Sequence, residues 1–152
     1  MMDARVSTVD FSSSFTAPPV VLVVDSSVDT CNRLCVGMSS AGYTVLITEN
    51  SNEALKYLEF IVPDAILIDA TSPDTGGFEL SRWIKASSVW ADIPVLFMVE
   101  LANNEQIIRS FENGGSDYLS KPLRIPEVLA RLTTRIAVRV EARDYVTRTD
   151  CH

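Results

Sequence analysis

The sequence predicts an α/β domain with a five-stranded parallel sheet, doubly wound by helices on both faces. Five short apolar runs rich in β-branched residues alternate with segments whose apolar residues recur every three to four positions. Parallel neighbours in a sheet need crossover connections, which are usually helices. Several of the apolar runs are continuous, as expected for strands buried on both faces.

The first three strands are expected at residues 20–24, 44–47 and 65–68. After the first strand, helical spacing from Val28 to Met38 predicts a helix, and Gly42 lies just past its end. Asn50 and Glu53 resemble a capping box that opens the second helix. A turn-rich stretch at 72–77 then leads into a third helix.

The second half of the chain repeats this alternation. We expect a fourth strand at 94–99 and a short fifth strand at Tyr118-Leu119. Between them, 103–113 forms a helix with an apolar stripe of Ile107, Ile108 and Phe111, stopped by Gly114-Gly115. The last helix begins near Pro126 and buries Leu129, Leu132 and Ile136.

These elements define one domain at residues 19–142. Residues 1–18 are rich in Ser and Thr without a sustained period, which predicts a flexible N-terminal leader. Residues 143–152 form a C-terminal tail that keeps a charged, helix-friendly composition at its start. The chain is 47% hydrophobic and 22% charged, which is ordinary for a globular domain.

The bulk composition also limits the function. A formal net charge of −7 argues against nucleic-acid binding by this domain, since that needs clustered Lys and Arg. No apolar run approaches the roughly 20 residues that span a bilayer, so we expect no membrane partner. Three cysteines without a C-x-x-C pair give neither a disulfide framework nor a zinc site, and a cytoplasmic location fits best.

Charged residues gather where strands end. Asp25, Asp69 and Lys121 fall at or just beyond the carboxyl ends of the first, third and fifth strands, the edge where reactive centres lie in such sheets. Two neighbouring carboxylates repel each other, and proteins often relieve this repulsion by binding Mg²⁺ through the carboxylate oxygens. An Asp in this setting can attack phosphorus and form an acyl phosphate, with the metal and the lysine offsetting charge.

Three segments carry a family resemblance: Val23-Val24-Asp25, the run from Asp69 to Pro73 followed by Gly76-Gly77, and YLSKP at 118–122. In this order and spacing they resemble the receiver domains of two-component response regulators, over roughly Pro19 to Ala142. The resemblance implies a flavodoxin-like, CheY-like fold and a signalling module that is not an enzyme, beyond self-phosphorylation or dephosphorylation of one aspartate.

The resemblance assigns a role to each matching position. Asp69 would be the phosphoacceptor, and Lys121 would contact the phosphoryl group. Asp25 and Asp69, with the backbone carbonyl of Thr71, would hold Mg²⁺. Tyr118 would be the switch aromatic, and Pro122 would follow a cis peptide. The phosphoryl donor would be the phosphohistidine of a histidine kinase or a phosphotransfer protein.

Two positions depart from the family pattern. Ser26 stands where a second metal-binding acid is usual, and Val99 stands where a Thr or Ser hydroxyl usually bonds the phosphoryl group. With Asp25, Asp69 and Lys121 alone, Mg²⁺ would leave a surplus of one positive charge, so we predict weak Mg²⁺ binding. The lost hydrogen bond removes a further ~1.5–3 kcal/mol of active-state stabilisation.

Several alternatives stay open. The chain is either a phosphorylatable receiver or a pseudo-receiver that works through protein contacts without phosphate. Asp69 could instead cap the turn that follows it. Glu100 either restores negative charge at the rim of the pocket or is a solvated loop carboxylate. A nucleotide or flavin binder is disfavoured, because the loop at 25–30 has no glycine and its two aspartates would repel a phosphate.

The resemblance also implies a partner surface. In this family the face of the fourth helix, fifth strand and fifth helix commonly binds an output domain or a second copy as a homodimer. Here that face would include Asn104, Ile107, Tyr118, Arg131 and Arg135. Residues 143–152 resemble the start of a signalling helix, or else are a solvated helix end. A fragment of a longer regulator and a stand-alone receiver are both compatible with the sequence.

Overall fold

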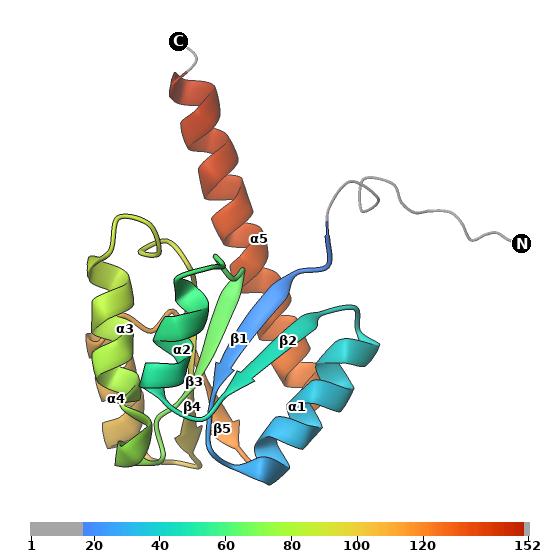
Figure 1. Ribbon diagram of the computed structural model, residues 1–152, viewed down its shortest axis with the longest axis vertical. Coiled ribbons are helices and arrows are strands. Elements are labelled where there is room, and N and C mark those ends of the chain that lie inside the picture. Colours follow the sequence, from blue (N-terminus) through green and yellow to red (C-terminus); the bar gives the residue numbers. More distant parts are fainter. Residues whose placement is uncertain (1–16, 151–152) are drawn as a thin grey trace, which may run out of the picture.

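The computed structural model describes residues 17–150, in which strands and helices alternate along the chain (Figure 1). Of the predicted leader at 1–18, all but Ala17 and Pro18 lies outside the described residues. The elements are β1 (Val20–Val24), α1 (Val28–Ser40), β2 (Thr44–Thr48), α2 (Ser51–Leu58), β3 (Ala65–Asp69), a 3₁₀ turn (Pro73–Thr75), α3 (Gly77–Ala86), β4 (Val95–Glu100), α4 (Asn104–Glu112), β5 (Asp117–Lys121) and α5 (Ile125–Asp150).

The five strands form one parallel sheet in the order β2-β1-β3-β4-β5, which confirms the predicted fold class. The strand order reverses at β1, so the chain winds to one side and then to the other. Val24 pairs with Ile68, and Asp69 pairs with Met98. The register therefore brings the carboxyl ends of β1 and β3 side by side at the point where the order reverses, the usual ligand position in open α/β sheets.

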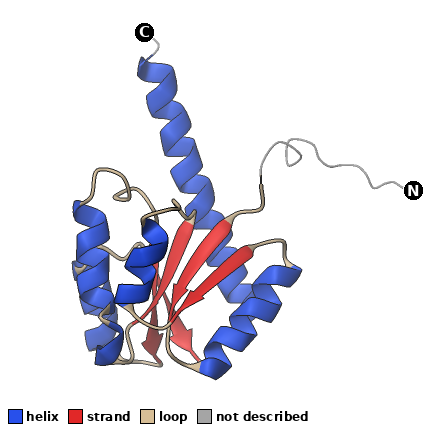
Figure 2. Cartoon of the chain, viewed as in Figure 1, coloured by secondary structure: helices blue, strands red, loops and turns tan. Residues whose placement is uncertain are grey.

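Helices cover both faces of the sheet (Figure 2). One face packs on α1 and α5 through a cluster that includes Val23, Leu34 and Leu132. The other face packs on α2, α3 and α4 through a cluster that includes Phe97. Successive strand residues alternate between the two clusters, because side chains in a strand point alternately to opposite faces. Both faces of the central strands are buried, as the continuous apolar runs predict.

Polar caps fix where the helices begin. The Ser27 hydroxyl accepts the Thr30 N–H at the start of α1, and the Asn103 side chain accepts the Gln106 N–H at the start of α4. At α2, the Asn50 side chain accepts the Glu53 N–H as predicted. The Glu53 carboxylate accepts from the N–H of Glu49, one residue before the cap, so the capping box is shifted by one position.

One helix differs from the sequence prediction, and the last helix continues into residues 143–152, where the start of a signalling helix was one of the expectations. In α4 only Ile107 packs against the core, whereas Ile108 and Phe111 are 56% and 49% exposed. The apolar stripe therefore points partly to solvent. The last helix runs unbroken past the predicted domain boundary at residue 142 and projects beyond the sheet (Figure 1). Within the described residues, no helix is both long enough and apolar enough to cross a membrane.

Gly77, the first residue of α3, lets this helix approach the end of β3 closely. A Cβ at this position would lie 2.5 Å from the Ile68 Cγ2 and 2.9 Å from the backbone oxygen of Asp69. We therefore expect Gly77→Ala to lower the free energy of unfolding by about 1–3 kcal/mol in urea denaturation. It should also shift the amide resonances of Ile68 and Asp69.

Gly42→Ala serves as the comparison. Gly42 has φ +94°, but an added Cβ there meets nothing within 4 Å. It should cost stability through backbone strain alone and leave the resonances at the end of β3 unchanged. A Gly77→Ala protein with wild-type stability and unmoved Asp69 resonances would contradict the close approach.

Candidate functional site

The structure brings Asp25, Asp69 and Lys121 together at the carboxyl edge of the sheet. Asp25 directly follows β1, while Asp69 and Lys121 are the last residues of β3 and β5. Both carboxylates are 1% exposed, and the lysine side chain is 18% exposed. The lysine is on β5, two strands away from β3 with Asp69 and three strands away from β1, which Asp25 follows. The Lys121–Pro122 peptide is cis.

Lys121 lies between the two acids. Its Nζ is 2.7 Å from Asp25 Oδ2 and 3.1 Å from Asp69 Oδ1. Burial by itself would lower the pKa of Lys121, but the two carboxylates outweigh it and raise this pKa above its ordinary value. The ammonium therefore stays charged and offsets the repulsion between two acids that are almost fully withdrawn from water.

The two oxygens of Asp69 have different surroundings. Oδ1 accepts hydrogen bonds from the backbone N–H of Thr71 at 2.9 Å and from its hydroxyl at 2.6 Å, in addition to the lysine contact. Oδ2 has a single long hydrogen bond of 3.3 Å from the Thr75 hydroxyl. Oδ1 is thus held by three donors, and Oδ2 is the less engaged oxygen.

These contacts bear on three sequence inferences. Asp69 does cap the turn that follows it, and it faces Lys121 at the same time, so the two interpretations are compatible. Thr71 contacts Asp69 through its N–H and hydroxyl, while a metal-binding role for its carbonyl stays a prediction. Thr75 is buried at 1% exposure and was missed, although it lies in the turn-rich stretch before Gly76.

Asp25 has one satisfied and one unsatisfied oxygen. Oδ1 accepts the backbone N–H of Ser27 at 2.8 Å. Oδ2 is buried and has no hydrogen bond of good geometry among the described residues, although Lys121 lies close to it. Ser26, next to it, is exposed.

Cys31 lies beside Asp25 and has a raised pKa of about 11. The main cause is burial of the thiol, and the negative charge of Asp25 adds to it, so this thiol is uncharged at neutral pH.

Val99 lies in an apolar environment. It is fully buried in the cluster that also receives Ile107 and Tyr118. Tyr118 is half-buried and packs edge-on against Phe111, with ring centroids 6.1 Å apart. Because Val99 cannot donate a hydrogen bond, its contact with this cluster is packing alone.

The side chain of Glu100 is exposed and held by the start of α4. Its Oε1 accepts from the side-chain amides of Asn103 at 3.1 Å and Gln106 at 2.7 Å. The intervening Ala102 has φ +61°, a backbone conformation that is uncommon outside glycine. Glu100 is thus an anchored carboxylate at the end of β4. Its backbone pairs with that of Lys121 in the sheet, but no ion pair joins their side chains among the described residues.

A groove of about 250 Å³ gives access to Asp69. Its walls come from the loop after β3, the start of α3 and the first turns of α4, including Phe78 and Gln106. The guanidinium of Arg109 stacks on the Phe78 ring at 4.3 Å and lines the same groove. Asp69 is thus one of the residues that line this groove, although its side chain is only 1% exposed.

The carboxylates suit a hard cation, but the set is small. Asp25 and Asp69 offer oxygen atoms at one place, on either side of the Lys121 ammonium. In the described part of the chain, no three His, Cys, Asp or Glu side chains gather into a metal-binding group. Mg²⁺ binds with one or two carboxylates and several waters, so the site fits this ion with few protein ligands.

The fold and the site together define a class of protein: a parallel α/β domain with an aspartate pair and a lysine at the carboxyl edge of its sheet. Residues 21–133 match the family described as response regulator receiver domain. The chain belongs to this family.

Two curated relatives illustrate the similarity. The chain is 33% identical over 112 residues to the phosphate regulon transcriptional regulatory protein PhoB of Pseudomonas aeruginosa, covering 74% of this chain and 49% of that protein. It is 29% identical over 114 residues to the DNA-binding dual master transcriptional regulator RpaA of Synechocystis, covering 75% and 47%. The chain thus spans about half the length of these relatives.

Solved structures agree with the fold. The receiver domain of the sensor histidine kinase PA1611 of Pseudomonas aeruginosa, with a magnesium ion in its active-site cleft, has a TM-score of 0.73 at 25% identity, covering 80% of this chain and 99% of that one. The receiver domain of a signal transduction histidine kinase from Syntrophus aciditrophicus has a TM-score of 0.71 at 26% identity, covering 78% and 90%.

The ion pairs of Lys121 lead to a stability prediction. Lys121→Met leaves two buried carboxylates without their cation, and we expect the free energy of unfolding to fall by about 3 kcal/mol at neutral pH. Adding Asp25→Asn to this variant should restore part of the loss. Lys56→Met, at an exposed lysine on α2, should change stability little. Equal stabilities of the Lys121→Met and Lys56→Met proteins would contradict the role of the lysine.

The same residue gives a pH dependence. Because the pKa of Lys121 is raised in the folded state, its stabilising contribution is complete below the unfolded-state pKa and is lost as the pH rises through the folded-state value. Above pH 10.5, the ordinary pKa of lysine, the wild-type protein should therefore lose stability more steeply than Lys121→Met. Parallel curves for the two proteins would contradict the raised pKa.

Proposed function

We propose that this receiver domain accepts a phosphoryl group on Asp69 from the phosphohistidine of a histidine kinase or a phosphotransfer protein, and that Mg²⁺ assists weakly. The observation that supports the proposal most is the ammonium of Lys121, placed between Asp25 and Asp69. A buried cation beside a reachable carboxylate is what stabilising an added phosphoryl group requires.

The chemistry follows from the two oxygens of Asp69. Oδ2, the less engaged oxygen, attacks phosphorus while the bond from phosphorus to the donor imidazole nitrogen breaks and the imidazole leaves. Oδ1 stays held by Thr71, which fixes the carboxylate during the attack. Lys121 then exchanges its contact with Asp69 for a phosphoryl oxygen. Mg²⁺, when held by Asp25, Asp69 and the Thr71 carbonyl, offsets the negative charge of the phosphoryl group.

A second candidate is a pseudo-receiver that signals through protein contacts alone. The observation in its favour is the environment of Val99, which is fully buried among apolar side chains and offers no hydroxyl toward the site. In this case the ion pairs of Lys121 serve stability only, and Asp69 stays unmodified. A response to a phosphodonor distinguishes the two functions.

Incubation with acetyl phosphate and Mg²⁺, followed by intact-protein mass spectrometry, should give one phosphoryl adduct. Asp69→Asn should remove it.

Ser26→Asp should tighten Mg²⁺ binding about tenfold, or about 1.4 kcal/mol, because a third carboxylate restores charge balance. Val99→Thr should prolong the life of the adduct. An unmodified wild-type protein at millimolar Mg²⁺, with an adduct that appears only in Ser26→Asp/Val99→Thr, would establish the pseudo-receiver instead.

We also place partner binding on the face of α4, β5 and α5. Ile108 and Phe111 of α4 are exposed apolar residues on this face. Next to them, Asp117 at the start of β5 binds the Arg131 guanidinium at 3.0 Å and lies 3.6 Å from Arg135. An apolar patch beside a charged network is typical of protein interfaces, and an output domain or a second copy would cover it.

Ile108→Glu should abolish self-association or partner binding through this face, because it buries an unpaired charge in the contact. Sedimentation or size-exclusion chromatography with light scattering measures the first, and pull-down with a purified output domain measures the second. Val28→Glu makes the same change at a 73% exposed position on α1 and should have no effect. Equal association of both variants and the wild-type protein would exclude this face.

A further inference from the structure

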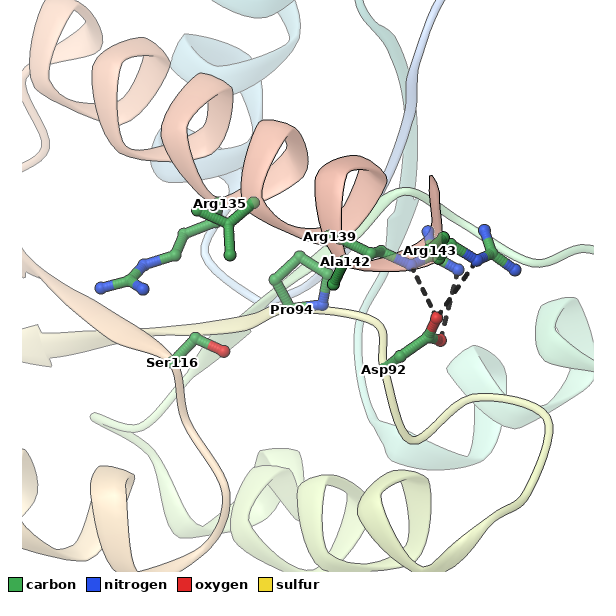
Figure 3. Close-up of a pocket in the computed structure, with 8 residues that line it drawn as sticks. Asp92, Pro94, Ser116, Arg135, Arg139, Ala142 and Arg143 are labelled. Carbon is green, nitrogen blue, oxygen red and sulfur yellow. Dashed lines mark hydrogen bonds and ion pairs between the residues drawn. The ribbon is translucent and has the colours of Figure 1, made fainter. Parts of the chain in front are cut away.

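A buried carboxylate oxygen at the site is held by a neutral hydroxyl. Beside α5, by contrast, Asp92 contacts the guanidiniums of Arg139 and Arg143, so this acid is neutralised by cations (Figure 3). The Oδ2 atom of Asp69 accepts one hydrogen bond, of 3.3 Å, from the hydroxyl of Thr75. Asp69 and Thr75 are each 1% exposed. The hydroxyl therefore meets the oxygen that is proposed to attack phosphorus, in a place withdrawn from water.

The turn after β3 brings Thr75 back to the strand end from which the chain left. Thr75 is the last residue of the 3₁₀ turn at Pro73–Thr75 and lies six residues after Asp69. Ser72 caps this turn by accepting a backbone N–H through its hydroxyl, and Gly76 ends the turn in the left-handed conformation, with φ +69°. The backbone of the turn thus fixes where the Thr75 side chain lies.

Thr75 lies off the groove that includes Asp69. The residues that line this groove run from Asp69 to Pro73 and resume at Gly77, and Thr75 is not among them. Among the described residues, the hydroxyl of Thr75 donates only to Asp69. A carboxylate oxygen has two lone pairs, so this hydrogen bond occupies one of them and leaves the other for phosphorus.

The inference rests on the proposed phosphorylation of Asp69, in which Oδ2 becomes the bridging oxygen of an acyl phosphate. In hydrolysis, a water oxygen bonds to phosphorus, the bond from phosphorus to Oδ2 breaks, and its electron pair stays on Oδ2. Both water protons leave with the phosphoryl group as dihydrogen phosphate. Because phosphoryl transfer passes through a loose transition state, Oδ2 already carries much of the charge of a carboxylate at that point.

We propose that Thr75 shortens the life of the acyl phosphate by donating its hydroxyl to Oδ2 as this oxygen becomes the leaving group. A hydrogen bond to a charged oxygen is about twice as strong as one to a neutral oxygen. The hydroxyl therefore stabilises the transition state of hydrolysis more than it stabilises the acyl phosphate. In phosphorylation, Oδ2 is charged both before the reaction and in the loose transition state, so the hydroxyl changes that rate little.

The test is the lifetime of the adduct on the full chain, followed by intact-protein mass spectrometry after acetyl phosphate is removed. Thr75→Val removes the hydroxyl and keeps a similar shape, and we expect it to slow hydrolysis about fivefold. Its rate of phosphorylation should stay within about twofold of the wild-type rate. Thr75→Ala, which also lacks the hydroxyl, should lengthen the lifetime in the same way. Thr75→Ser keeps the hydroxyl and should retain the wild-type lifetime.

Thr48→Val is the matched control. Thr48 is also 1% exposed, but its hydroxyl donates to the carbonyl of Val23 at 2.8 Å. This variant loses a buried hydroxyl without touching Asp69, so its adduct should hydrolyse at the wild-type rate.

The outcomes separate the role of Thr75 from the phosphorylation itself. An adduct with the wild-type lifetime in Thr75→Val and Thr75→Ala would overturn the role of Thr75 and leave the phosphorylation of Asp69 standing. The same holds for equal lengthening in Thr75→Val and Thr48→Val, or for a Thr75→Val protein in which only phosphorylation is slower. No adduct on the wild-type protein or on any variant would overturn both.

Discussion

The candidate site depends on one interaction, the placement of the Lys121 ammonium between two carboxylates that are almost completely buried. Asp25 and Asp69 lie at the carboxyl ends of neighbouring strands, so the sheet brings their side chains close together. Without a cation, the repulsion between the two carboxylates and the cost of removing them from water would oppose folding. The lysine comes from β5, two strands away from β3, so its charge links opposite parts of the sheet. The same cation that stabilises the fold is the group that a phosphoryl oxygen would engage.

Much of this architecture follows from local sequence patterns. Continuous apolar runs predicted the buried strands. Gly42, just past the end of α1, and Asn50, the cap of α2, were also recognisable from the sequence. The position of Asp25, Asp69 and Lys121 at one edge was predictable, because parallel strands bring their carboxyl ends together. The sequence could not predict that Lys121 lies closer to Asp25 than to Asp69, because these distances depend on how side chains pack across the sheet.

Other features needed the three-dimensional structure. Thr75 gives no sequence signal that distinguishes it from other turn residues, yet it is buried against the carboxylate of Asp69. The stripe of α4 has helical spacing, but the spacing does not say that Ile108 and Phe111 face solvent. Arg139 reads as a surface residue of a charged helix, and only the packing of α5 over the residues before β4 shows that it is buried. In each case a long-range contact decides the outcome.

Ser26 and Val99 separate this chain from the usual sequence pattern of receiver domains. The site keeps the two aspartates and the lysine but lacks a hydroxyl at position 99. A crystal structure with Mg²⁺ and beryllofluoride tests this account most directly. The account predicts beryllofluoride bonded to Oδ2 of Asp69, with the Lys121 ammonium on a fluorine and Oδ1 still held by Thr71. An unaltered Asp69, with Lys121 still between the two carboxylates at saturating beryllofluoride, would contradict it.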